Sequence, residues 1–134
     1  MLMNTIALAA DGEALFNDTC ALCHQGGGIG SPGLAPPLVD KILWDRLGSN
    51  APAYIAGVML AGFSGTIEVS GIKYSGLIMP PQSQLTDDQL AAIGNYVLSK
   101  LNDSREEVVP TAIASLRAAL PTHTRLRAMR RTGS

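Results

Sequence analysis

Two cysteines and a histidine lie within five consecutive residues, in the stretch Cys20-Ala21-Leu22-Cys23-His24. Two thiols three positions apart on a helical turn can bond to the two vinyl groups on one edge of a porphyrin, and the imidazole that follows can then bind the iron. The pattern therefore predicts one covalently attached haem c. Cys20 and Cys23 would anchor the porphyrin, and His24 would be an iron ligand.

Three other chemistries fit these residues less well. A thioredoxin-like cysteine pair follows a strand in an α/β pattern, whereas this pair ends a predicted helix in a chain without a parallel-strand pattern. Zinc needs a fourth protein ligand, and the only other histidine, His123, lies in a basic tail. A disulfide between thiols this close is strained and closes almost no loop. Haem attachment is therefore the favoured interpretation.

The second axial ligand decides between two uses of a haem. A second strong ligand makes an electron carrier, whereas an open face can bind and activate small molecules. Met79 lies in an uncharged turn that the following prolines stiffen. Met59 lies on an apolar helical stripe, which is typical of a wall position. We predict His24 and Met79 as the two iron ligands, a pair that raises the reduction potential relative to two histidines.

A first and a last helix are the clearest secondary-structure predictions. Asp11 is a good N-cap for a helix that runs toward the cysteine pair. Thr86 and Gln89 have the spacing of a capping box, and the apolar positions after them predict a helix through about Leu101. On the first helix, the face that carries Phe16, Cys20 and Cys23 is expected to be buried.

Shorter elements connect the two helices. The glycine- and proline-rich residues 25–37 cannot form regular structure and are predicted to be a loop. A short helix is expected over 39–47, and a further helix capped by Ser49 or Asn50. Alternating apolar residues between 65 and 76 indicate a small two-stranded hairpin. The fold class is therefore all-α with one hairpin.

Length and charge limit what the chain can be. Its 134 residues amount to one domain, and with only 4% aromatic residues the core formed by its own side chains is thin. Residues 1–103 carry four basic and nine acidic groups, whereas residues 104–134 carry six arginines and two glutamates. An acidic body argues against nucleic acid as a partner. No run of 18 apolar residues exists, so no membrane span is predicted.

The two ends of the chain have separate interpretations. Residues 1–10 are either the remnant of a secretory signal or a frayed terminus. Residues 11–102 form the predicted domain, and 103–134 a basic C-terminal extension. That extension is either a partly disordered or self-packed segment, or an arm that docks an acidic partner such as a dehydrogenase.

These residues resemble a class I mono-haem c-type cytochrome of the bacterial type, over about residues 10–102. The resemblance rests on several positions together: Gly12, Phe16, the haem-attachment stretch 20–24, Pro36, Met79-Pro80 and Tyr96. It implies a cytochrome c fold in which the first and last helices cross, with Gly12 and Phe16 against Ile93 and Tyr96. It also implies that the backbone oxygen of Pro36 accepts a hydrogen bond from His24.

The resemblance further implies a function in electron transfer rather than catalysis. The protein would be located in the periplasm. It would accept electrons from a flavin- or quinone-cofactor dehydrogenase, either as a separate electron acceptor or as the cytochrome subunit of that enzyme. It would then pass the electrons to a respiratory acceptor. A peroxidase-like enzyme or sensor with an open sixth iron position is the alternative. Trp44, Arg46 and Tyr54 are candidates to bind the haem propionates, with an ordinary surface or core position as the equal alternative for each. Residues 19–39 and 74–86 carry no charge and predict a neutral docking ring around the haem edge.

Overall fold

The computed structural model describes residues 10–76 and 78–134, and it consists mostly of helices. The predicted all-α class with one small hairpin is confirmed. The proposed signal remnant lies, except for Ala10, outside the described residues. Among the helices of the described part, none is both long and apolar enough to cross a membrane. The α-helices are α1 (Gly12–Thr19), α2 (Ala21–His24), α3 (Lys41–Leu47), α4 (Ala51–Ala61), α5 (Asp87–Asn95), α6 (Pro110–Ala118) and α7 (His123–Thr132).

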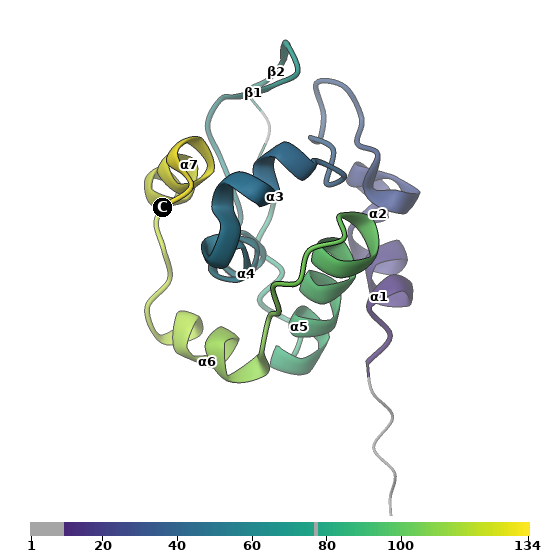
Figure 1. Cartoon of the computed structure of the whole chain (residues 1–134), viewed down its shortest axis with the longest axis vertical. Helices are drawn as coiled ribbons and strands as arrows, with labels where there is room; N and C mark the ends of the chain where they lie inside the picture. The colour runs from purple at the N-terminus through teal and green to yellow at the C-terminus, as the bar shows by residue number, and fades with distance from the viewer. Residues whose placement is uncertain (1–9, 77) are drawn as a thin grey trace, which may run out of the picture.

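The first and last helices of the predicted domain cross, as expected. The side chain of Asp11 accepts a hydrogen bond from the Ala14 N–H and caps α1, while Thr86 and Gln89 form the predicted capping box of α5. A Cβ atom on Gly12 would lie 2.2 Å from the Ala92 carbonyl oxygen, so only glycine permits this approach of the two backbones. Figure 1 shows α1 alongside α5.

Aromatic packing completes this crossing. The ring centroids of Phe16 and Tyr96 lie 5.3 Å apart in a tilted arrangement, which is the contact that the resemblance implies. Phe16 is fully buried. The C-terminal part of the long helix differs from the expectation, because residues Tyr96–Leu101 (η3) form a π-helical segment. The consecutive residues Val97 and Leu98 of this segment are both buried in the core.

The hairpin consists of β1 (Ile67–Val69) and β2 (Ile72–Tyr74), paired antiparallel. Ser70 and Gly71 both have positive φ angles, of 51° and 78°, as the predicted two-residue turn requires. The chain then returns toward the body of the molecule. Short 3₁₀ turns occur at η1 (Gly26–Gly28) and η2 (Gly48–Asn50).

Residues 103–134 pack against the rest of the chain. Helices α6 and α7 contact α4, and α7 also contacts α3, so the segment wraps around α4 on the side away from α1 (Figure 1). Gly57 on α4 leaves room for Pro121 and Leu126, which a Cβ atom there would approach to 2.9 and 3.0 Å. Ile113 and Leu126 are fully buried. The segment therefore supplies part of the hydrophobic core.

Polar anchors also hold this segment. The Arg117 guanidinium donates to Asp87 Oδ1 at 2.7 Å and to the Ser83 and Leu85 carbonyl oxygens. Asn50, expected to cap α4, makes no side-chain cap and instead donates to the Gly133 carbonyl oxygen at 2.9 Å. That carbonyl is far away in the sequence, and only the packing of the C-terminal segment brings it within reach.

Candidate functional site

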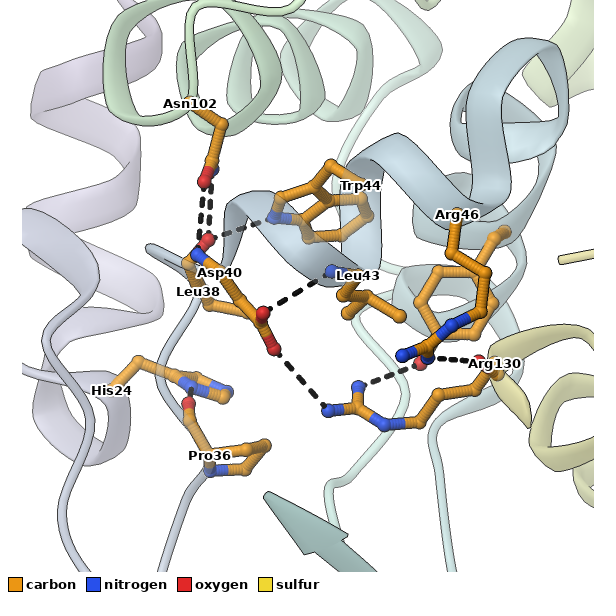
Figure 2. Close-up of polar contacts among 10 residues, drawn as sticks. His24, Pro36, Leu38, Asp40, Leu43, Trp44, Arg46, Asn102 and Arg130 are labelled. Atoms are coloured by element: carbon orange, nitrogen blue, oxygen red, sulfur yellow. Dashed lines mark hydrogen bonds and ion pairs between the residues drawn. The ribbon is translucent and has the colours of Figure 1, made fainter. Parts of the chain in front are cut away.

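His24 ends α2 and is held by one hydrogen bond from its ring. Its Nδ1 lies 2.8 Å from the Pro36 carbonyl oxygen, the partner that the resemblance implies (Figure 2). Because a carbonyl only accepts, Nδ1 carries the hydrogen and Nε2 keeps its lone pair. Burial lowers the pKa of His24, with the Pro36 bond acting in the opposite direction. The imidazole is therefore neutral and oriented as a metal ligand requires.

The loop after His24 positions that carbonyl. Gly30 donates its N–H to the His24 carbonyl oxygen at 2.8 Å, and Ser31 pairs with Ala35 in a short antiparallel bridge. Gly30 has a φ of 80°, and a Cβ atom there would lie 2.6 Å from the Pro37 nitrogen. The glycine- and proline-rich composition thus produces a tight loop that returns the chain to the His24 ring.

The two cysteines are free and close to this histidine. Cys20 is half-buried, and its burial raises the pKa of the thiol to about 11, whereas Cys23 is exposed. A raised pKa is the reverse of what a thioredoxin-like nucleophile needs, because such a thiol acts as a thiolate. His123, the other histidine, is occupied elsewhere: its Nδ1 lies 2.7 Å from Ser64 Oγ and its Nε2 2.7 Å from the Ala61 carbonyl oxygen. It therefore does not complete a zinc site with the cysteines.

A cavity of about 310 Å³ brings the predicted residues together. Cys20, Cys23, His24, Pro36 and Met79 all line it, and its walls are mainly apolar. Its volume lies at the lower end of the ~300–1,000 Å³ typical of ligand sites. The donor set of two thiols, one neutral imidazole and one thioether, around an apolar space, fits the chemistry of a haem c.

The backbone around Met79 is held from α4 and the residues that follow it. Met79 and Phe63 exchange two backbone hydrogen bonds, of 3.1 and 2.9 Å. Gln82 donates its N–H to the Met59 carbonyl oxygen at 2.7 Å. Met79 is half-buried and lines the cavity. Met59 also lines the cavity, but it is buried and packs within the core, which is the position expected of a wall residue.

The three candidates for binding the haem propionates have different environments. Trp44 lines the cavity, but its Nε1–H already donates to the Leu38 carbonyl oxygen at 2.9 Å. Arg46 is exposed, is absent from the cavity wall, and donates to the Arg130 carbonyl oxygen at 2.9 Å. Only Tyr54 lines the cavity and presents its hydroxyl group to a cation, Arg130.

Two contributors to the site were missed by sequence reasoning. Arg130 on α7 lines the cavity although it lies in the basic tail, where no local pattern separates it from its neighbours. Asn102 is buried, accepts a hydrogen bond from the Asp40 N–H and donates to the Leu38 carbonyl oxygen (Figure 2). The sequence signal for Asn102 is its position directly after an apolar helix. An ordinary C-terminal capping residue occupies the same position, so this signal did not identify it.

Comparisons with known proteins agree with this arrangement. The family model described as "Cytochrome c" matches residues 9–100. A cytochrome c-552 of Thermus thermophilus is 36% identical over 107 residues, covering 79% of this chain and 71% of the relative. The fructose dehydrogenase cytochrome subunit of Gluconobacter japonicus is 32% identical over 118 residues, covering 86% of this chain but 24% of that longer protein.

Proposed function

The chain belongs to the cytochrome c family, and on that premise we propose that it carries one haem c held by Cys20, Cys23, His24 and Met79. Members of this family are one-electron carriers with a covalently attached haem c, not enzymes. When bound, the haem iron supplies the one-electron oxidation and reduction. The observation that supports this residue set is that all four residues line one mainly apolar cavity.

Each residue has a separate task in this proposal. Cys20 and Cys23 form the thioether bonds that keep the cofactor attached. His24 offers Nε2 to the iron while the Pro36 carbonyl oxygen fixes the ring through Nδ1. Met79 offers its sulfur from a loop whose backbone is held by Phe63. Two strong ligands from a rigid frame keep structural change small when the redox state changes, which is what an electron carrier needs.

The exposed rim of the cavity is the proposed docking face. Leu22, Leu34 and Ile78 line the cavity and are also exposed, at 86%, 47% and 70% of their surface. No charged residue occurs in 19–39 or 74–86. A neutral apolar rim favours small, short-lived contacts with a redox partner whose own surface is neutral and apolar.

A flavin- or quinone-cofactor dehydrogenase is the proposed electron donor, and a respiratory protein the acceptor. The similarity to the cytochrome subunit of a fructose dehydrogenase supports this class of donor. The proposed location is the periplasm, because covalent haem attachment in bacterial proteins of this kind takes place outside the cytoplasmic membrane. Mixing the oxidised protein with a purified dehydrogenase of this class and its substrate should give rapid reduction, with ascorbate as the control reductant. A protein that ascorbate reduces but that the dehydrogenase and its substrate do not reduce would contradict the proposed donor class.

Spectroscopy of the matured protein tests the ligand set. We expect a weak charge-transfer band at the red end of the ferric spectrum, which marks methionine ligation, and slow or absent binding of carbon monoxide. Rapid binding of carbon monoxide or cyanide by the unaltered protein would instead favour the alternative, a peroxidase-like enzyme or sensor with an open sixth position. Colourless matured protein would contradict the proposed haem site altogether.

A further inference from the structure

One charged side chain reaches the haem cavity, and it comes from the C-terminal segment. Within residues 10–76 and 78–134, Arg130 is the only Lys, Arg, Asp or Glu that lines the cavity. Its side chain is 13% exposed, so the guanidinium is largely removed from water. An isolated charge in such a place is costly, and it is retained where it meets an opposite charge.

The fold holds Arg130 in place from several sides. Its Nη1 donates to the Tyr54 hydroxyl oxygen at 3.2 Å. Its Nη2 lies 4.0 Å from Asp40 Oδ2 (Figure 2). Arg46 donates to the Arg130 backbone carbonyl oxygen at 2.9 Å and so ties α7 to α3. Asp40 is itself held, because its Oδ1 accepts a hydrogen bond from the Leu43 N–H as the N-cap of α3.

These contacts leave part of the hydrogen-bonding capacity of Arg130 and Tyr54 unused, and both residues line the cavity. A guanidinium has five N–H donors. The side chain of Arg130 uses one contact at Nη1, with Tyr54, and one at Nη2, with Asp40. The 4.0 Å separation from Asp40 is long for an ion pair. Tyr54 accepts from Arg130, and no acceptor for its own hydroxyl hydrogen occurs among the described residues. Burial raises the pKa of Tyr54, so its hydroxyl keeps that hydrogen.

We propose that Arg130 and Tyr54 form a carboxylate-binding subsite for a haem propionate, which makes the C-terminal segment a determinant of the reduction potential. The inference rests on the proposed haem site and adds Arg130 to it, beside Tyr54, which the sequence had already made a candidate for binding a propionate. An arginine matches a carboxylate in geometry and charge, and a phenol hydroxyl adds a neutral donor. Asp40 is the opposing charge that keeps the guanidinium oriented.

The arrangement predicts that removing the charge of Arg130 and removing the charge of Asp40 shift the reduction potential in opposite directions. Removing the Arg130 cation leaves the propionate charge uncompensated, which favours the oxidised, more positive iron and lowers the reduction potential. Removing the Asp40 anion does the reverse and raises it. A merely structural disturbance of the cavity would not produce opposite shifts from the two members of one ion pair.

The experiment measures reduction potentials of the matured protein and of single variants. Arg130→Gln should decrease the equilibrium constant for reduction about threefold or more, where a tenfold change is about 59 mV for one electron. Asp40→Asn should increase it, since asparagine keeps the helix cap but not the charge. Arg130→Lys keeps the positive charge, so most of the decrease seen in Arg130→Gln should be absent from this variant. Arg131→Gln, on the exposed face of the same helix, is the matched control and should leave the potential unchanged.

The outcomes separate this inference from the proposed function. A potential unchanged in Arg130→Gln, or shifts of the same sign in Arg130→Gln and Asp40→Asn, would overturn the subsite even if every variant retains its haem spectrum. Tyr54→Phe should lower the potential by less than Arg130→Gln, because it removes a donor and no charge; an unchanged potential would remove Tyr54 from the subsite. Loss of the haem spectrum in the unaltered protein would instead contradict the haem site itself.

Discussion

Met79 and Phe63 exchange two backbone hydrogen bonds, of 3.1 and 2.9 Å, although the hairpin lies between them in the sequence. The bridge involves no side-chain atom of Met79. Gly62, with a φ of 73°, allows the close approach, because a Cβ atom there would lie 2.6 Å from the Met79 carbonyl oxygen. A substitution of the Met79 side chain therefore leaves the loop in place and tests the thioether alone.

Met79→Ala should open the sixth iron position without unfolding the protein. We expect loss of the charge-transfer band at the red end of the ferric spectrum, a lower reduction potential and rapid binding of carbon monoxide. Met59→Leu is the matched control, since Leu and Met exchange in a core for less than about 1.5 kcal/mol. It should keep the spectrum of the unaltered protein. A ferric spectrum that changes in Met59→Leu but not in Met79→Ala would transfer the ligand role to Met59.

Gly12→Ala should weaken the crossing of α1 and α5. The new methyl group would overlap the Ala92 carbonyl oxygen, and overpacking of this kind costs about 1–3 kcal/mol of unfolding free energy. Urea unfolding followed by circular dichroism measures it. Gly26→Ala is the control, because nothing lies within 4 Å of its Cβ position. Equal stability losses in the two variants would show that the helix crossing is not the cause.

Asn102→Leu should be among the most destabilising single substitutions. The Asn102 side chain accepts from the Asp40 N–H at 2.9 Å and donates to the Leu38 and Val97 carbonyl oxygens, each at 2.8 Å. Leu38 keeps the Trp44 donor, so two groups lose their partner. Each buried group left without a partner costs about 1–3 kcal/mol, so a loss of about 2–6 kcal/mol of unfolding free energy is expected. Asn17→Leu, at an exposed position of α1, should change stability by less than about 0.5 kcal/mol.

Arg117→Gln should loosen the C-terminal segment from the body. The guanidinium joins α6 to Asp87 and to two backbone carbonyl oxygens, and charge-assisted bonds of this kind contribute about 1.5–3 kcal/mol when partly buried. Because this side chain is 31% exposed, the lower end of that range is expected. Arg125→Gln, exposed on α7, is the control for charge. Hydrogen exchange of α6 and α7 that is the same in both variants would contradict the anchoring role.

The neutral rim of the cavity predicts a weak effect of salt on electron transfer. Steering by opposite charges makes association rates fall steeply with ionic strength, whereas an apolar contact does not. Rates with a redox partner should therefore change little between low and physiological salt. Leu22→Lys, at the most exposed of the rim residues, should slow the reaction without altering the haem spectrum. A steep salt dependence for the unaltered protein would contradict the neutral docking face.

Because the C-terminal segment packs against the rest of the chain, its predicted role as an arm that docks a partner cannot be tested by deletion alone. Three of its six arginines, Arg117, Arg127 and Arg130, contact groups in the body of this chain, which leaves Arg105, Arg125 and Arg131 exposed. Deleting residues 104–134 would remove buried Ile113 and Leu126 together with any docking surface. Substitution of the exposed arginines separates these two effects.

Local chemistry explains what the sequence by itself determined. The attachment stretch at 20–24, the caps at Asp11 and Thr86, and the Ser70-Gly71 turn each depend on residues within one or two turns of one another. The resemblance extended this to the Phe16–Tyr96 contact and to the Pro36 carbonyl oxygen, both of which the structure contains. Spacing along the chain carries such information directly.

Tertiary packing alone decided which charged side chain reaches the cavity. Arg46 follows the haem-side loop closely in sequence yet lies exposed, whereas Arg130 comes from the far end of the chain and lines the cavity. The tail has several arginines at helical spacing, and their sequence does not distinguish the one that turns inward. That choice depends on how α7 packs on α3 and α4 and on the positions of Asp40 and Tyr54, which are contacts between residues remote in sequence.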